Sequence, residues 1–203
     1  MNKSLFDFFL ALTLLVFLFP ILLFIAILIR FKLGSPIFFI QKRCGHKGRT
    51  FNLIKFRTML EIKDDTGLDL PDIERMTSFG NFLRSTSLDE LPEIFNVLKL
   101  EMSFIGPRPL LVRYMPLYSK DQMRRHNVRP GITGWAQING RNKTTWDERF
   151  KLDLWYVDNK SFWLDLKILL ITLKKVILRE DIYFDNSSSM PFFKGNNSNQ
   201  DEK

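Results

Sequence analysis

Two adjacent acidic residues, Asp89 and Glu90, lie in a part of the sequence with many basic residues around it. An aspartate is ionised at neutral pH, so it can attack phosphorus without a separate base to activate it. Consecutive residues on a helix point about 100° apart. One carboxylate can therefore face phosphorus while its neighbour faces a metal ion, an arrangement typical of phosphoryl transfer.

A structural explanation competes with this chemistry. Ser87 and Glu90 have the spacing S-x-x-E, which is the pattern of a capping box at the start of a helix. Pro92 and acidic residues also suit a first helical turn. Taken alone, these residues favour capping, and only the surrounding cations shift the interpretation toward catalysis.

The most specific of these cations is Arg108, which stands between Pro107 and Pro109. The two prolines restrict the backbone, so the guanidinium is presented with little conformational freedom and suits bidentate binding of phosphate. Five further basic residues lie in or beside irregular segments and are candidate phosphate ligands: Lys55, Arg57, Arg84, Arg129 and Arg141. Two acids among many cations predict a site for phosphorylated substrates.

The composition agrees with an anionic partner. The chain has 203 residues and a net charge of +8, and this charge suits nucleic acid, anionic lipid or a phosphorylated substrate. It contains no recognised nucleic-acid-binding motif, so nucleic acid is not expected. Its single cysteine, Cys44, excludes an intramolecular disulfide and a cysteine-based zinc site. His46 and His126 are far apart and favour two surface histidines over metal ligation.

The segment 8–29 has 22 uncharged residues, long enough to cross a hydrocarbon core of about 30 Å. It lacks the cleavage site of a signal peptide. Pro20 divides it into twelve residues before and nine after, and neither half spans the core alone. The residues leave open a kinked spanning helix and a hairpin whose ends share one side of the membrane.

The remaining patterns predict a mostly helical α+β domain with a small β-hairpin formed by residues 35–43 and 50–59. Glycine and proline predict loops over 103–111 and 129–141. Helices are expected over 72–86, 88–99, 116–128, 145–159 and 161–181. The last of these has at most six uncharged residues in a row, so it suits an interfacial amphipathic helix or an ordinary core helix.

Several motifs together resemble the small monotopic phosphoglycosyl transferases, bacterial enzymes that place the first sugar phosphate on polyprenyl phosphate. The resemblance covers roughly residues 1–180 and includes the subgroup of PglC-type enzymes of protein glycosylation. It rests on four segments: QKRCG, KFRTM, LRSTSLDELPEIFNVLKLEMSFIGPRP and RPGITGWAQINGR.

The resemblance implies a role for each matching position. Asp89 would be the nucleophile that forms a phosphosugar intermediate and releases UMP from a UDP-sugar. Glu90 would hold Mg²⁺, and Arg108 would bind phosphate. Gln137 lies in the segment RPGITGWAQ, which would help to shape the nucleotide-sugar site. Polyprenyl phosphate would then accept the phosphosugar.

The resemblance also implies a topology. Residues 1–32 would form a re-entrant helix broken at Phe19 and Pro20, with both ends cytoplasmic. Residues 33–184 would form the catalytic domain. The segment 185–203 lies beyond the resemblance; it is polar and shows no motif, so its composition predicts a disordered tail. The protein would then be monotopic in the bacterial inner membrane, in contact with membrane lipids, with its active site on the cytoplasmic face.

Two positions depart from the family pattern. Many relatives have serine where this chain has Phe19, so the helix break must rely on Pro20 and on packing. The usual glycine before the acidic residue of the segment LEMS is Leu100, a position where a left-handed turn would be strained.

Two other functions stay open at this stage. A membrane-anchored basic module that binds anionic lipid would explain the charge, but it gives no role to Asp89 and Glu90. Direct in-line attack by prenyl phosphate on the UDP-sugar would keep the fold and change the chemistry. The sequence leaves open which UDP-sugar is used, with N-acetylated sugars expected from the family, and whether the chain forms a homodimer.

Overall fold

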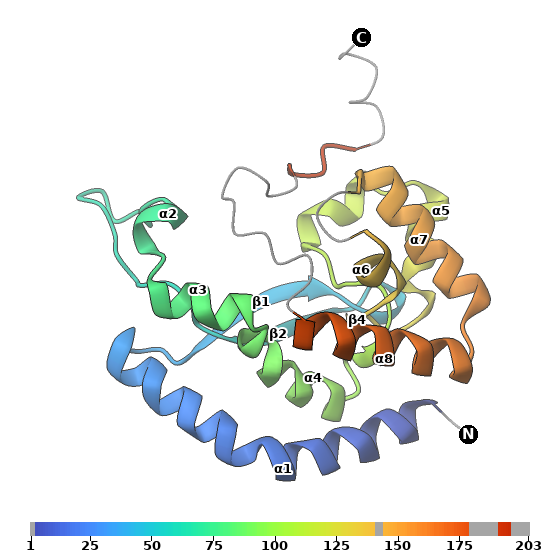
Figure 1. Cartoon of the computed structure of the whole chain (residues 1–203). Helices are drawn as coiled ribbons and strands as arrows, with labels where there is room; N and C mark the ends of the chain where they lie inside the picture. Colours follow the sequence, from blue (N-terminus) through green and yellow to red (C-terminus); the bar gives the residue numbers. More distant parts are fainter. Residues whose placement is uncertain (1–2, 141–143, 179–190, 196–203) are drawn as a thin grey trace.

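A computed structural model of the chain describes residues 3–140, 144–178 and 191–195. One long helix, α1 (Lys3–Lys32), runs beneath a domain of short helices and two small sheets (Figure 1). This agrees with the predicted α+β class, in which helices dominate and a β-hairpin is the main sheet.

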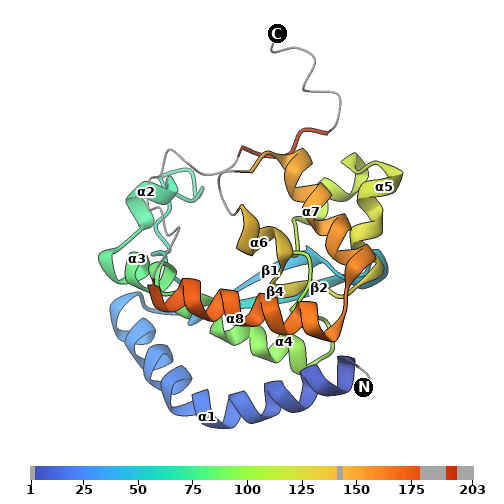
Figure 2. The same ribbon diagram turned by 45° about the vertical axis from the view of Figure 1, so that its right-hand side comes forward.

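Helix α1 is continuous, although Pro20 lies inside it. Figures 1 and 2 show that it bends along its length, so that both of its ends approach the domain. The predicted break at Phe19 and Pro20 is therefore a bend. Proline has a helical φ and removes one backbone hydrogen bond, that to the carbonyl of Val16, so the helix can continue at an angle.

Only a narrow strip of α1 is buried. Ala11 belongs to one hydrophobic cluster of the domain, with Ile94, and Ile25 and Ile29 belong to another, with Leu83. Large apolar side chains cover the rest of the helix and are exposed: Phe9, Val16, Phe17, Phe24 and Phe31 among them. Within the described residues, α1 is the one helix long and apolar enough to cross a membrane, judged by length and composition.

The predicted hairpin is confirmed. Strands β1 (Phe38–Cys44) and β2 (Thr50–Phe56) pair antiparallel, joined through the short 3₁₀ helix η1 (His46–Gly48). Asn96 is fully buried and fixes the hairpin to the helical part. Its side chain donates to the carbonyl of Asn52 and accepts from the amide of Ile54.

The two segments predicted as loops contain a second, parallel sheet, formed by β3 (Ser103–Ile105) and β4 (Gly131–Thr133). The helix α6 (Trp135–Asn139) follows β4. The loop prediction was wrong here because the glycines permit close approach of two backbones. A Cβ on Gly106 would lie 2.3 Å from the carbonyl oxygen of Arg129, so this position requires glycine.

Three predicted helices are divided into shorter elements. An extended residue, Met76, bridges to Met59 and separates α2 (Asp72–Arg75) from α3 (Ser78–Ser85). The segment 88–99 begins as the 3₁₀ helix η2 (Leu88–Glu93) before α4 (Ile94–Leu98). In place of the helix predicted over 116–128 are η3 (Val112–Leu117), α5 (Lys120–Met123) and η4 (Arg124–Asn127).

The two C-terminal helices are confirmed as α7 (Trp146–Asn159) and α8 (Phe162–Leu178). Ile168 of α8 is fully buried, so this helix packs on the core. Its other side is apolar and exposed, with Trp163, Leu170 and Ile177 at helical spacing. The helix therefore has both features that the sequence left as alternatives, a core face and an exposed apolar face.

Residues 191–195 belong to the tail that was expected to be disordered, yet they pack on the domain. Phe193 is 5% exposed and lies in a cluster with Leu110, Tyr114 and Phe150. The indole of Trp146 donates to the carbonyl of Pro191 at 2.8 Å. These five residues differ from the expectation because they carry apolar surface that the domain can bury.

Candidate active site

Two elements bring cations to the carboxylate of Glu90, which lies on η2. Its Oε1 accepts from Lys55 Nζ of β2 at 2.5 Å and from Arg108 Nη2, in the loop after β3, at 2.8 Å. Lys55 is also 3.2 Å from Oε1 of Glu93, one turn further along η2. The structure thus brings together three of the candidate site residues, Lys55, Glu90 and Arg108.

The local backbone explains why Glu90 faces these cations. Ser87 adopts the left-handed conformation with φ of 55°, and its side chain caps no helix. The capping box that Ser87 and Glu90 favour when taken alone is therefore not formed. Charge-assisted hydrogen bonds from Lys55 and Arg108 are stronger than a bond to a neutral backbone amide, and they hold the Glu90 side chain instead.

Asp89 forms no ion pair within the described residues, in contrast to Glu90. Burial and the neighbouring charge of Glu90 raise the pKa of Asp89 to about 6, while Lys55, Arg108 and Arg84 oppose this shift. The carboxylate is therefore mostly ionised at neutral pH and is not neutralised by a bonded cation. These are the properties of a usable nucleophile.

The neighbouring carboxyls of Asp89, Glu90 and Glu93 differ in pKa. Burial opposes ionisation of Glu90, but Arg108 and Lys55 outweigh it and hold the pKa of Glu90 below its usual range. Burial and the charge of Glu90 raise the pKa of Glu93 to about 7. One acid of this site stays ionised, and two have pKa values near neutral pH. Such a site suits reactions in which negative charge develops on one group and is lost from another.

Arg108 is presented by a fixed loop. Pro107 and Pro109 are buried, whereas the Arg108 side chain between them is 44% exposed. The backbone carbonyl of Arg108 accepts from Arg125 Nη2 at 2.8 Å. Arg125 is itself bonded to Asp153, at 2.7 Å, and both are 2% exposed. This buried pair holds the loop while leaving the Arg108 guanidinium outside.

Arg84 lies close enough to Asp89 for its charge to lower the pKa of that carboxyl. Its Nε donates to Thr58 Oγ1 at 3.0 Å, which orients the guanidinium. Arg84 therefore lies beside Asp89, and its role in phosphate binding stays a prediction.

Other predicted residues lie elsewhere. Arg57 is 5% exposed and donates to the carbonyls of Leu33 and Ser35, so it closes the end of α1. The side chain of Arg129 turns to Ser4 at the start of α1. For these two residues, long-range packing sets a direction that sequence position does not reveal.

Of the other predicted residues in the 129–141 segment, Gln137 makes no side-chain hydrogen bond to the site. The side-chain amide of Gln137 is buried, and neither of its polar atoms has a hydrogen-bond partner in the described structure. Arg141 lies outside the described residues. The contribution of this segment to the site is its backbone: Gly131 donates to the carbonyl of Pro107 at 3.1 Å.

Sequence reasoning missed the pair of Arg125 and Asp153, and it left Glu93 out of the site. Arg125 and Asp153 are 28 positions apart in the sequence, and no local spacing predicts a contact across that separation. Glu93 carried a signal, since it lies three residues after Glu90 and therefore near it on a helical turn.

The carboxylates can supply oxygen ligands to a divalent cation, although the described residues hold no group of three potential metal-binding side chains. Mg²⁺ is often bound by one or two carboxylates together with substrate phosphates, and the carboxylate of Glu90 fits that requirement. Oε1 of Glu90 is occupied by Lys55 and Arg108, so Oε2 is the atom that fits a metal.

A long apolar helix thus lies beside a domain in which carboxylates and cations converge. The sequence matches the family model for bacterial sugar transferases over residues 1–179. The chain therefore belongs to the bacterial sugar transferase family.

Its relatives divide by length. The chain is 52% identical to the sugar transferase EpsL of Bacillus subtilis, over 95% of this chain and 96% of EpsL. It is 42% identical to the UDP-glucose:undecaprenyl-phosphate glucose-1-phosphate transferase of Xanthomonas campestris, over 89% of this chain. This match spans only 40% of that longer protein. The exopolysaccharide production protein ExoY of Sinorhizobium fredii is 37% identical over 88% of its length.

Proposed function

We propose that this protein transfers a sugar 1-phosphate from a UDP-sugar to polyprenyl phosphate and releases UMP. The observation that carries the proposal is the contrast between Asp89 and Glu90. Asp89 is ionised and has no ion-pair partner among the described residues, while Glu90 beside it is held by Lys55 and Arg108. The activity for which the Xanthomonas campestris relative is named supports the same donor and acceptor classes.

The chemistry proceeds in two displacements. A carboxylate oxygen of Asp89 attacks the β-phosphorus of the donor, the bond from that phosphorus to the bridging oxygen breaks, and UMP leaves. The acceptor phosphate oxygen then attacks the phosphorus held on Asp89 and restores the free carboxylate. Arg108 and Lys55 lie where they can stabilise the negative charge that develops on the phosphate oxygens.

Mg²⁺ belongs to this proposal as the cofactor, held by Glu90 together with the donor phosphates. When bound, it would neutralise charge on the departing UMP. Lys55 and Arg108 hold the Glu90 side chain through Oε1, so Oε2 is the oxygen that would bind the ion.

We place the active site on the cytoplasmic face of the inner membrane, with α1 re-entrant. A straight helix of 30 residues is about 45 Å long, enough to place its ends on opposite sides. Instead, Lys3 donates to the carbonyl of Ile105 and pairs with Asp165, at 2.9 and 2.7 Å, while the other end of α1 leads into the hairpin. Both ends therefore lie at the same domain.

Helix α8 completes the membrane-facing surface in this proposal. Its exposed apolar row, which includes Trp163, Leu170 and Ile177, suits a position in the headgroup region beside the exposed face of α1.

A trapping experiment tests the covalent step. The full chain is incubated with a UDP-sugar labelled in the β-phosphate and quenched with denaturant before or after addition of polyprenyl phosphate. We expect label on the wild-type chain before addition and its loss afterwards. Asp89→Asn should carry no label and should reduce turnover at least about a thousandfold. Asp121→Asn, an exposed acid on α5, is the matched control.

Absence of label on an active wild-type enzyme would support direct in-line attack and contradict the intermediate. UMP release measured over a panel of UDP-sugars, including UDP-glucose and N-acetylated sugars, identifies the donor. No release with any member would contradict the transferase function and support a non-catalytic membrane module.

A further inference from the structure

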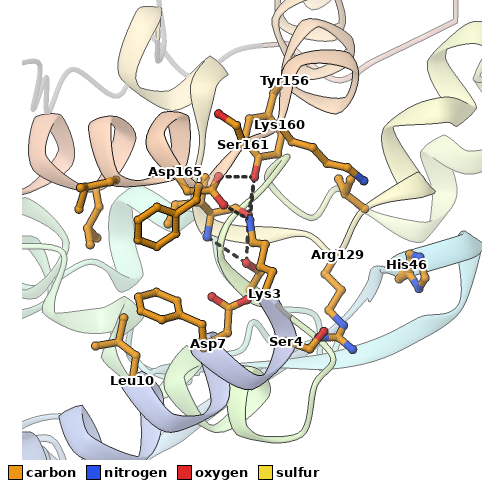
Figure 3. Close-up of a pocket in the computed structure, with 17 residues that line it drawn as sticks. Lys3, Ser4, Asp7, Leu10, His46, Arg129, Tyr156, Lys160, Ser161 and Asp165 are labelled. Carbon is orange, nitrogen blue, oxygen red and sulfur yellow. Dashed lines mark hydrogen bonds and ion pairs between the residues drawn. The ribbon is translucent and has the colours of Figure 1, made fainter. Parts of the chain in front are cut away.

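A cavity of about 400 Å³ lies between the first turns of α1, the start of α8 and strand β3 (Figure 3). It is separate from the candidate active site, because none of Lys55, Asp89, Glu90 and Arg108 lines it. Figure 3 shows Lys3 at its centre, with Leu10 toward one side and Arg129 and His46 toward the other.

One part of the cavity wall is apolar. Phe6 of α1 and Phe162 of α8 meet edge to face, with ring centroids 5.9 Å apart. They are 37% and 50% exposed, so the mouth of the cavity opens on the outer surface of these two helices. That surface continues into the exposed side chains of Phe9 and Trp163, the surface that the proposed topology turns toward lipid.

The other part of the wall is charged. Arg129 and Lys160 line it together with Asp7, a carboxyl whose pKa is raised by burial. Arg129 donates from Nη1 to Ser4 Oγ at 2.7 Å, and Lys160 lies on the same side. Neither is within ion-pair distance of a carboxylate in the described part of the chain. Lys3, by contrast, is fully engaged with Asp165, Tyr156 and the carbonyl of Ile105. The charge available to a ligand therefore comes from Arg129 and Lys160.

We infer that this cavity binds one anionic phospholipid, with its phosphate at Arg129 and Lys160 and the upper part of an acyl chain between Phe6 and Phe162. The inference rests on the proposed membrane position of α1 and α8. A cavity of this size suits the headgroup and first part of a chain, while the remainder extends along the exposed face of α1.

The acceptor, polyprenyl phosphate, has the same combination of phosphate and apolar chain. It is not the occupant we assign, because its phosphate must reach Asp89 and the residues around Asp89 do not line this cavity. A bound phospholipid would instead fill the space between α1 and α8, where Lys3 ties the N-terminal end of α1 to Asp165.

Lipid binding is measured by native mass spectrometry of the full chain in mild detergent, titrated with phosphatidylglycerol or phosphatidylcholine. We expect one phosphatidylglycerol to bind at lower concentration than phosphatidylcholine, which has no net charge. Arg129→Gln and Lys160→Gln should each weaken phosphatidylglycerol binding about fivefold, since each removes one cation near the phosphate. Lys151→Gln, an exposed lysine of α7 outside the cavity, is the matched control.

A second pair of variants tests whether the cavity holds the acyl chain of the phospholipid. Leu166→Trp fills the cavity and should abolish the bound phospholipid, whereas Leu170→Trp, on the exposed face of the same helix, should not. Equal binding of the two lipids, or unchanged binding in all three cavity variants, would overturn the inference. So would one-for-one displacement of phosphatidylglycerol by polyprenyl phosphate at lower concentration.

The lipid count needs no turnover, so the two proposals fail separately. If no UDP-sugar yields UMP and yet the expected lipid pattern is found, the transferase function alone is wrong. If UMP is released and the lipid pattern is absent, the cavity assignment alone is wrong.

Discussion

At the scale of single residues, the ionisation of Asp89 links the site to pH. From the sequence alone, Asp89 is expected to be an ordinary aspartate that is fully ionised at neutral pH. In the structure, burial and the charge of Glu90 raise its pKa to about 6. The attacking form is the carboxylate, so it is lost as pH falls through about 6. We expect kcat/KM for UMP release to fall about tenfold from pH 7 to pH 5.

The link between the pKa of Asp89 and the pH dependence of kcat/KM can be tested by removing a neighbouring charge. Arg84 lowers the pKa of Asp89, so Arg84→Gln should move the acid limb of the profile to higher pH. Arg75→Gln, which removes an arginine paired with Asp69 and Asp72 on the protruding α2 segment, should leave the limb in place. A profile that is flat between pH 5 and 7 would contradict the assignment of Asp89.

Leu100 is strained, as its departure from the family pattern predicts. It has a φ of 59° where α4 ends, in the left-handed region that costs a non-glycine residue roughly 1–2 kcal/mol. Leu100→Gly relieves this strain and adds some entropy to the unfolded chain. We expect a net gain in stability of about 0.5–1 kcal/mol, seen as a higher melting temperature.

The neighbouring residue provides the control for this prediction. Lys99 has a φ of −75°, so Lys99→Gly relieves no strain and should lower the melting temperature. Equal melting temperatures for the two variants would show that the left-handed turn at Leu100 costs little.

At the scale of elements, the docked segment 191–195 lies beyond the region that matches the family model, which ends at residue 179. Phe193 packs against Leu110 of the Arg108 loop and against Phe150 of α7. Because Phe193 is 5% exposed, Phe193→Ala should cost about 3 kcal/mol of stability. Thermal unfolding of the full chain in detergent measures this loss.

Phe192 is the matched control within the same segment. It is 67% exposed, and its main contact is the guanidinium of Arg113, 4.2 Å from the ring centroid. Phe192→Ala should therefore cost less than about 1 kcal/mol. Similar melting temperatures for Phe193→Ala and the wild type would show that the segment does not dock in solution.

At the scale of the whole molecule, the bend in α1 and the tie between Lys3 and Asp165 place both helix ends at the domain. We predict that a single cysteine introduced as Asn2→Cys, in a Cys44→Ser background, reacts with an impermeant thiol reagent only after cell lysis. Cys44 is 1% exposed in the wild type, so its replacement serves to remove residual labelling. Lys151→Cys in the same background provides the cytoplasmic reference.

Labelling of Asn2→Cys in intact cells would place the N-terminus outside and contradict the re-entrant topology. Pro20→Ala tests the cause of the bend, because a straight helix of this length can span the bilayer. Pro20→Ala is therefore combined with Asn2→Cys in the Cys44→Ser background. If the introduced cysteine still reacts only after lysis, the contacts of Lys3 and of the buried residues Ala11 and Ile25 are sufficient to hold the bend.

The sequence by itself determined the features whose signals are local. The uncharged length of α1, the hairpin, and the periodic patterns of α7 and α8 depend on neighbouring residues, and the structure confirms these elements. The pair of Asp89 and Glu90 and the fixed position of Arg108 between prolines were also readable. Short helices were not, because tertiary contacts such as the bridge from Met59 to Met76 interrupt them.

Only the tertiary structure decided which cations meet the carboxylates. Lys55 lies 35 positions before Glu90 and Arg108 lies 18 after it, yet both bond to the same oxygen. Arg57 and Arg129 were equally good candidates by sequence, but packing turned one to the end of α1 and the other to its start. The direction of a long side chain depends on contacts between distant segments, and local sequence carries no record of these contacts.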